Sequence, residues 1–435
     1  MTTTNQSCKP CPKVFDLERA IKEAGRCLLC KDAPCSADCP ACTDPGKFIR
    51  QIRFENYLGA ARTIRRNNPM GHTCAMTCPV EKLCVKACAA KALENPIEIR
   101  NLQEFACRFG QEHGLEPLRT PVKKHAAKIA VIGAGPAGIS CACTLAQAGY
   151  VVEIFEREKQ AGGVATWNIP EYRLPLKVVK HDLQNLADLG IKVHYGVEPT
   201  TPEALAQFRA IFISTGLAEP YRLPLLAHCG NAVDYIQFLR DAKSAQPQVK
   251  LHHKVVAVIG GGSVAVDAAC SAVQLGARKV YLIALEDLAH LPADEEELKL
   301  AQQMHIIIKP NTQITAVKKD QQHKITGLSG IEIEPEQTGK FIPTALKLLA
   351  GTEFSLNVDY VVEAIGTKPS SAVANLVKDL KVQGKGTIVV QENFATNVPG
   401  VFAGGDVVNG GATIAKAVGD GKKAAQSIID FITRQ

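Results

Sequence analysis

Residues 128–158 read KIAVIGAGPAGISCACTLAQAGYVVEIFERE: an apolar run, a glycine-rich turn, a helical stretch and a second apolar run. The spacing of Gly133, Gly135 and Gly138 matches the dinucleotide-binding fingerprint, in which the glycines make the turn, admit a pyrophosphate and let helix and strand pack closely. Glu156 ends the second apolar run, where an acid can accept a hydrogen bond from a ribose hydroxyl. The stretch therefore predicts a strand–helix–strand unit that binds a dinucleotide.

A second unit of the same kind spans residues 254–287, KVVAVIGGGSVAVDAACSAVQLGARKVYLIALED. Its fingerprint positions hold Gly260, Gly262 and Ala265. Glu286 and Asp287 follow its second apolar run, where a 2′-phosphate would require Arg or Lys, so we predict that this site uses NADH rather than NADPH. The alternative is that both acids are ordinary loop residues. Two dinucleotide sites in one chain indicate that one cofactor reduces the other.

The composition narrows the class of protein. Of 435 residues, 46% are hydrophobic and 21% are charged, which excludes a disordered chain, collagen and a membrane bundle. The longest uncharged stretch, 129–152, contains glycines and a proline and belongs to the first unit, so we do not expect it to span a membrane. The N-terminus has no apolar signal region. We therefore expect a cytoplasmic protein, in which clustered cysteines more often bind metal than form disulfides.

Twelve of the 16 cysteines lie in the first 107 residues. They include two groups of four, which are Cys27, Cys30, Cys35 and Cys39, followed by Pro40, and Cys74, Cys78, Cys84 and Cys88. Such groups suit either two zinc sites or two iron–sulfur clusters. Zinc sites usually contain paired C-x2-C motifs, and within these groups only Cys27 and Cys30 have that spacing, so we favour clusters. We assign no role to Cys8, Cys11, Cys42 and Cys107.

The cysteine-rich segment is also basic. Residues 1–128 carry 21 Lys and Arg against 13 Asp and Glu, and the whole chain has a net charge of +7. A zinc-dependent nucleic-acid-binding protein would suit such a segment, but it leaves both glycine-rich units unexplained. We instead expect the positive charge to offset metal-bound thiolates and to face a protein partner, with neither nucleic acid nor a membrane bound.

The C-terminal residues 401–425, VFAGGDVVNGGATIAKAVGDGKKAA, place Asp406 after an apolar run and two glycines, and a predicted helix begins near Thr413. They resemble the second FAD contact of flavoproteins with two dinucleotide-binding domains, in which the aspartate binds the ribityl chain and the helix N-terminus faces the flavin. The stretches ISTG, 213–216, and AIG, which ends at Gly366, resemble the strand–glycine crossings between the FAD and NAD domains of that group.

We predict an α/β protein with three domains. Residues 1–120 form an N-terminal all-α iron–sulfur domain. Residues 127–250 and 367–435 are the two parts of a doubly wound, Rossmann-like FAD domain, and residues 251–366 form a second doubly wound domain, for NAD, inserted between them. The Pro- and Lys-rich stretch 116–128 is the expected linker after the helical domain.

The chain resembles the FAD/iron–sulfur oxidoreductases typified by the glutamate synthase small subunit and, among them, the PreT subunits of bacterial NAD-dependent dihydropyrimidine dehydrogenase. The resemblance covers nearly the whole chain. It is densest in IKEAGRCLLCKDAPCSADCPACTDPGKFIR (21–50), NPMGHTCAMTCPVEKLCVKAC (68–88), IPEYRLP (169–175) and the flavin motifs. Two positions depart from the family pattern: Ser263 replaces its usual aspartate, and Leu285 replaces a common basic residue, which supports NAD over NADP.

The resemblance implies two [4Fe–4S] clusters with interleaved ligands. One would be held by Cys27, Cys30, Cys35 and Cys88, and the other by Cys39, Cys78, Cys84 and the amide of Gln103. Cys74 then lies near the second cluster without binding it, although the residues themselves do not decide between Cys74 and Gln103. The resemblance also implies that Gly163 and Arg173 are among the residues that bind FAD.

The implied activity is that of an electron-input subunit, which oxidises NADH and passes electrons through FAD and the two clusters. The recipient would be a catalytic FMN/iron–sulfur partner (PreA-like) that reduces uracil or thymine to the 5,6-dihydropyrimidine, in a heterotetramer. Hydride transfer needs no general acid, so no catalytic side chain is expected. The alternatives are an NAD(P)H-dependent glutamate synthase small subunit and a regulatory flavoprotein that binds cofactors without turnover.

Overall fold

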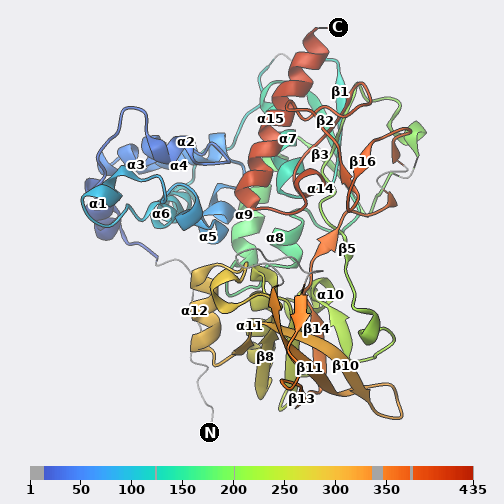
Figure 1. The fold of residues 1–435 in the computed structure, drawn as a ribbon. Coiled ribbons are helices and arrows are strands. Elements are labelled where there is room, and N and C mark those ends of the chain that lie inside the picture. The colour runs from blue at the N-terminus through green and yellow to red at the C-terminus, as the bar shows by residue number, and fades with distance from the viewer. Residues whose placement is uncertain (1–13, 123–124, 200, 336–345, 373–375, 435) are drawn as a thin grey trace. The chain divides into compact units, whose positions relative to one another are not determined.

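The computed structural model describes residues 14–122, 125–199, 201–335, 346–372 and 376–434, so Cys8 and Cys11 lie outside the described residues. The chain forms two compact units. One comprises the described residues up to Thr166, together with Glu171–Ala218 and those from Lys368 onward, and the other comprises Trp167–Pro170 and Glu219–Thr367. The second unit is therefore inserted into the sequence of the first (Figure 1).

The N-terminal part of the first unit is helical, as predicted. Its helices are α1 (Leu17–Gly25), α2 (Pro34–Ala37), α3 (Pro45–Arg53), α4 (Tyr57–Asn67), α5 (Gly71–Thr77) and α6 (Ile99–Glu112), with 3-10 turns η1 (Val80–Lys82) and η2 (Ala89–Ala92). Asp16 and Asn56 cap α1 and α4 by accepting from the backbone N–H of Arg19 and Gly59, which satisfies donors that a helix start leaves unpaired. The helices enclose a core that includes Phe15, Phe48, Ile52, Leu102 and Phe105.

The rest of the first unit is a parallel five-stranded sheet with helices. The strand order is β18-β4-β1-β2-β3, from β1 (Lys128–Ile132), β2 (Val151–Glu156), β3 (Lys192–Tyr195), β4 (Ala210–Ile213) and β18 (Val401–Ala403). The helices are α7 (Pro136–Gln147), α8 (Val164–Trp167), α9 (Leu176–Asp188), α14 (Asp406–Asn409) and α15 (Ile414–Thr433); η3 (Pro202–Leu205), β16 (Val382–Gln383) and β17 (Thr387–Ile388) complete the unit. This arrangement is doubly wound, as predicted.

Helices α7 and α15 lie side by side in this unit (Figure 1). Their backbones touch at Gly421, where any Cβ atom would collide with the carbonyl oxygen of Ala137. The Ser140 hydroxyl also donates to the carbonyl of Val418 at 2.8 Å. Small residues thus let a helix from the end of the chain pack directly on the helix that follows the first glycine loop.

The second unit contains another parallel five-stranded sheet, of order β6-β14-β7-β8-β9. Its strands are β6 (Ala232–Asp234), β7 (Val255–Ile259), β8 (Lys279–Ile283), β9 (Ile307–Lys309) and β14 (Tyr360–Glu363), with helices η4 (Pro224–Leu226), α10 (Tyr235–Ala242), α11 (Ser263–Gln274), η5 (Leu288–His290) and α12 (Glu295–Gln303). An antiparallel sheet that we did not predict follows β9 and consists of β10 (Thr312–Lys319), β11 (Ile325–Pro335), β12 (Leu346–Leu348) and β13 (Phe354–Asn357).

One predicted domain boundary lies elsewhere in the structure. We placed the start of the inserted domain at residue 251, whereas the second unit begins at Glu219, because β6 pairs with β14 and so completes its sheet. The two crossings pair as the short strands β5 (Glu219–Pro220) and β15 (Thr367–Lys368). The described residues of the predicted domain 1–120 share one compact unit with the first sheet. Among the described helices, none has the length and apolarity needed to cross a bilayer.

Candidate cofactor-binding site

The first glycine loop joins β1 to α7. Gly133 has a φ of 98°, a conformation that side chains disfavour, and Gly135 caps the N-terminus of α7. A Cβ on Gly138 would collide with the carbonyl oxygen of Gly133, and one on Gly163 would lie 3.0 Å from Cα of Gly135. The loop is therefore packed from two sides by glycines, which leaves the N–H groups at the start of α7 able to bind a pyrophosphate.

Glu156 stands beside this loop at the end of β2. Its carboxylate accepts from the backbone N–H of Ala134 at 2.7 Å and of Glu158 at 2.8 Å. The residue is 7% exposed, and burial raises the pKa of its carboxyl. The two hydrogen bonds fix the acid against the loop, where the predicted contact with a ribose hydroxyl would lie.

The C-terminal FAD motif lies in the same unit. Asp406 begins α14, and its Oδ1 accepts from the N–H of Ala412 at 3.1 Å. Burial raises the pKa of Asp406 to about 6. Thr413 caps α15 by accepting from the N–H of Lys416 at 3.1 Å, and Arg173 is half-buried in the turn before α9. A half-buried acid and a capped helix start are the groups that a ribityl chain and a flavin need.

The second glycine loop has the same geometry in the second unit. Gly260 has a φ of 138°, and a Cβ on it would collide with the carbonyl oxygen of Ala364, the residue that follows β14. Gly262 caps α11, and Ala265 is buried in that helix's first turn. Gly366 follows in the crossing that contains β15, and its own φ is also positive. The loop therefore fits a second dinucleotide.

The two acids after β8 differ in what they contact. One carboxylate oxygen of Glu286 lies 2.9 Å from where a Cβ on Gly261 would stand, so this side chain reaches the glycine loop. Asp287 instead accepts from the N–H groups of Ala289 and His290 and caps η5. Of the two acids, Glu286 is therefore the one that reaches the glycine loop. Asp287 is an ordinary loop residue that caps a short helix.

The cysteines line two cavities in the helical part. The first encloses about 410 Å³, part of it open to solvent, and its lining includes Cys27, Cys30, Cys35 and Cys88. The second encloses about 390 Å³, also partly open, and its lining includes Cys39, Cys74, Cys78, Cys84 and Gln103. The cavities have Ile99 in common, and Ala415 of α15 lines the second. The structure thus brings together the interleaved residues of each predicted ligand set.

The chemistry of these donors fits iron. Burial raises the pKa of Cys35 to about 11 and that of Cys84 to about 12. Such thiols keep their protons at neutral pH unless a metal replaces them, and thiolates are the usual ligands of iron–sulfur clusters. Within the described residues, no three His, Cys, Asp or Glu side chains lie close enough together to hold a single metal ion.

Both candidates for the remaining ligand line the second cavity. Nε2 of Gln103 donates to the carbonyl of Gly71 at 2.6 Å, which leaves the amide oxygen as the atom able to bind iron. Cys74 is buried, and its thiol hydrogen-bonds with that of Cys78, which helps to raise the pKa of Cys78. Cavity geometry alone therefore does not choose between them.

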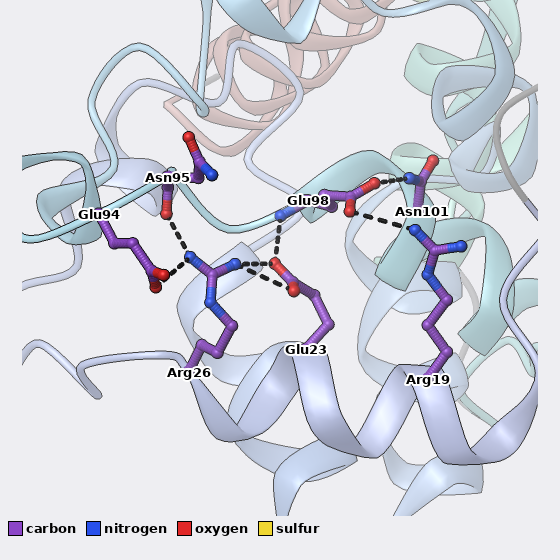
Figure 2. Close-up of polar contacts among 7 residues, drawn as sticks. All are labelled: Arg19, Glu23, Arg26, Glu94, Asn95, Glu98 and Asn101. Carbon is purple, nitrogen blue, oxygen red and sulfur yellow. Dashed lines mark hydrogen bonds and ion pairs between the residues drawn. The ribbon is translucent and has the colours of Figure 1, made fainter.

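A polar network joins α1 to the segment that follows Cys88, and Figure 2 shows its contacts. Arg26, next to Cys27, donates to the carboxylate of Glu23 at 2.8 Å and to the carbonyl of Asn95 at 2.5 Å. Glu23 in turn accepts from the N–H of Glu98 at 2.9 Å and is 9% exposed. The network fastens the segment that follows Cys88 to α1, so that Cys88 meets the three cysteines near α2.

Sequence reasoning missed several residues that shape these sites. The Ser214 hydroxyl donates to the carbonyls of Ile132 and Gly133 at 3.0 and 3.1 Å and so braces the first loop. Ser214 lies in the stretch ISTG, 213–216, which the sequence indicated only as a crossing, and its role at the glycine loop was not predicted. Ile99 and Ala415 carry no chemical signal, because an apolar residue in a helix has the same appearance in any core.

The fold and these cavities define the class. Residues 127–421 match the family model of pyridine nucleotide-disulphide oxidoreductases, and residues 4–115 match that of dihydropyrimidine dehydrogenase domain II, 4Fe-4S cluster. The predicted α/β architecture is confirmed, and so is the preference for iron–sulfur clusters over zinc. The zinc-dependent nucleic-acid-binding alternative is set aside.

The chain belongs to the PreT family of NAD-dependent dihydropyrimidine dehydrogenase subunits, as the resemblance predicted. It is 35% identical to the PreT subunit of Salmonella typhimurium, over 95% of this chain and 94% of that one. It is 36% identical to PreT of Escherichia coli K12 over the same shares. A more distant relative is the NADP(+)-dependent formate dehydrogenase subunit beta of Moorella thermoacetica, at 33% identity over 92% of this chain and 60% of that one. Members of the PreT family are oxidoreductase subunits.

Solved structures agree on the fold. Thioredoxin reductase of T. acidophilum is 25% identical, with a TM-score of 0.53, over 69% of this chain and 97% of that one. FprA from Mycobacterium tuberculosis has a TM-score of 0.60 over 71% of this chain and 85% of that one, at 14% identity, and shows the fold alone.

Proposed function

We propose that this chain is the cytoplasmic, NADH-oxidising subunit of a dihydropyrimidine dehydrogenase. The observation that carries the proposal is that α15 contributes both to the flavin motif and to a cysteine cavity: Thr413 caps the helix and Ala415 lines the second cavity. One helix thus joins the predicted flavin site to the predicted clusters. When bound, NADH, FAD and two [4Fe–4S] clusters supply the hydride and single-electron chemistry.

The residues of the chain bind and orient these groups. In the first unit, the proposed FAD contacts are Gly133, Gly135, Gly138, Glu156, Gly163, Arg173, Asp406 and Thr413. In the second, the proposed NADH contacts are Gly260, Gly262, Ala265, Glu286 and Gly366. Glu286 lies close to the glycine loop, which supports a role as hydrogen-bond acceptor for the ribose hydroxyls of NADH. An acid at this position would also repel the 2′-phosphate of NADPH.

We assign the cluster ligands by cavity. One cluster is held by Cys39, Cys78, Cys84 and the amide oxygen of Gln103. We call it the flavin-side cluster, because Ala415 of α15 lines its cavity. The other cluster, which we call the distal cluster, is held by Cys27, Cys30, Cys35 and Cys88. Its cavity lies on the other side of Ile99 from the flavin-side cluster. The shared Ile99 supports electron transfer between neighbouring clusters, since their cavities meet at one side chain.

The partner in this proposal is a catalytic subunit that carries FMN and further iron–sulfur clusters (PreA-like), and the two form a heterotetramer. It reduces uracil or thymine to the 5,6-dihydropyrimidine. The relatives' designation as subunits of NAD-dependent dihydropyrimidine dehydrogenase supports this assignment. The Moorella relative is a subunit of a different dehydrogenase. Identifying the partner of this chain would therefore distinguish a dihydropyrimidine dehydrogenase from another complex.

Anaerobic mixing with NADH tests the first part of the proposal, which is that this chain takes electrons from NADH. The purified chain should lose its flavin absorbance and develop the paramagnetic signals of reduced clusters, and NADPH should be much less effective. A spectrum unchanged by NADH would overturn the proposal. The chain alone should not reduce uracil, whereas the complex isolated from the native host should; uracil reduction by the chain alone would contradict the division of labour.

A further inference from the structure

One face of α15 covers the loop that carries Cys39. Ala415, Gly419 and Lys422 are spaced i, i+4 and i+7, so they lie on the same side of the helix. Ala415 lines the second cavity. A Cβ on Gly419 would collide with the carbonyl oxygen of Pro40, next to Cys39. The helix that Thr413 caps is therefore in direct backbone contact with the cysteine loop.

Lys422 completes this contact with a charge. Its Nζ donates to the carbonyl of Ala41 at 2.9 Å and to that of Asn67 at 2.6 Å, and the residue is half-buried. Among the described residues, the charged groups that act on this ammonium are Cys42 and Cys39, with no carboxylate among them. Lys416 on the same helix, by contrast, pairs with Asp420.

A half-buried cation without an anionic partner is costly, because carbonyl dipoles replace its hydration only in part. The nearby groups that carry negative charge once they are deprotonated are the thiols of Cys39 and Cys42. Burial lowers the pKa of Lys422, and Cys42 and Cys39 oppose that shift. A cluster bound by Cys39 would place permanent negative charge where the ammonium lacks it.

We propose that Lys422 is a positioning residue for the flavin-side cluster: it holds the Cys39 loop on α15 and places a fixed positive charge that favours the reduced cluster. The inference rests on the proposed function. Reduction adds a negative charge, and a nearby cation stabilises that charge by Coulomb attraction in a poorly solvated setting. Net charge and outer-shell contacts are the means by which proteins tune cluster potentials.

The test separates the effect of the Lys422 charge from the effect of its hydrogen bonds to the Cys39 loop. Lys422→Gln removes the charge and leaves a shorter side chain with an amide donor, and Lys422→Arg keeps the charge. Lys423→Gln is the matched control, because Lys423 is the next residue of α15 and is exposed. Each full-length holoprotein is titrated anaerobically, with the two clusters followed by electron paramagnetic resonance and the iron and FAD contents measured.

We expect Lys422→Gln to shift the midpoint of the flavin-side cluster to more negative potential, and Lys422→Arg and Lys423→Gln to leave it near the wild-type value. The distal cluster and the NADH-driven bleaching of flavin should not change. A wild-type midpoint in Lys422→Gln, with both clusters and FAD retained, would overturn the inference but leave the proposed function standing. If Lys422→Gln loses the cluster, the uncharged variant Lys422→Met is titrated in its place, and a wild-type midpoint in Lys422→Met would overturn the inference.

Discussion

Asp182 of α9 accepts a hydrogen bond from the backbone N–H of Thr73 at 2.7 Å, in the first turn of α5. A second backbone donor, His72, lies 3.4 Å from the same carboxylate. A helix of the sheet region thus caps the helix that carries Cys74 and leads to Cys78. The cap links the stability of the flavin region to that of the cysteine cavities.

Asp182 predicts a pH dependence of stability. Burial raises the pKa of this carboxyl from 3.8 to about 7, so the folded chain binds a proton that the unfolded chain releases. The resulting contribution to the free energy of unfolding is fully present below pH about 4 and is lost as the pH rises through about 7. Asp182→Asn should flatten the change in unfolding midpoint between pH 5 and 8, measured by circular dichroism. An equally steep change in this variant would contradict the prediction.

The network around Glu23 predicts selective loss of one cluster. Glu23→Ala removes the acceptor for the Glu98 N–H and one of the partners of Arg26, and losing these part-buried contacts costs about 1 kcal/mol each. The segment after Cys88 should detach, so that iron content falls by about half while FAD is retained. Arg19→Ala is the control, since its contact with Glu98 is exposed and 3.5 Å long. Full iron content in Glu23→Ala would refute the role.

Gln103 and Cys74 are separable by paired substitution. Because the Gln103 amide is held by the carbonyl of Gly71, Gln103→Ala should cost the flavin-side cluster its oxygen ligand and lower its occupancy. Cys74→Ala should keep the cluster. Paramagnetic resonance and iron analysis of both proteins give the answer. The reverse pattern, with the cluster surviving Gln103→Ala, would make Cys74 the ligand.

Glu286 predicts the choice of coenzyme. Glu286→Gln should lower kcat/KM for NADH about tenfold, which corresponds to losing a charge-assisted hydrogen bond of about 1.5 kcal/mol, and should raise the relative rate with NADPH. Asp287→Asn is the control, because Asp287 caps η5. Stopped-flow bleaching of the flavin with each coenzyme measures both effects. Unchanged discrimination in Glu286→Gln would remove this residue from the site.

We expect two substitutions in the first glycine loop to impair different properties, one the stability of the apoprotein and the other its affinity for FAD. Gly138→Ala places a methyl group against the Gly133 carbonyl, so the loop must shift and the apoprotein should lose stability. Gly135→Ala meets no atom within 4 Å, so it should fold normally and lose only FAD affinity. Thermal unfolding of the apoproteins and FAD titration distinguish these outcomes. Normal FAD binding by Gly135→Ala would show that the pyrophosphate does not approach this residue.

Local patterns determined the parts of the fold that depend on neighbouring residues. A β-run, three spaced glycines and a following acid specify each strand–helix–strand unit, because turn geometry and close packing act within about 30 residues. The cysteine spacing indicated metal ligands for the same reason. The antiparallel sheet β10–β13 was missed, since alternating strands of moderate polarity give a weak signal.

Only the tertiary structure decided how distant residues combine. Cys88 joins Cys27, Cys30 and Cys35 in one cavity because Glu23 and Arg26 hold a later segment on α1. Likewise, Lys422 stands beside the Cys39 loop because glycines let α15 pack against α7 and Pro40. The sequence by itself determined which residues could bind cofactors and metal. Their grouping depended on long-range packing, which no local spacing encodes.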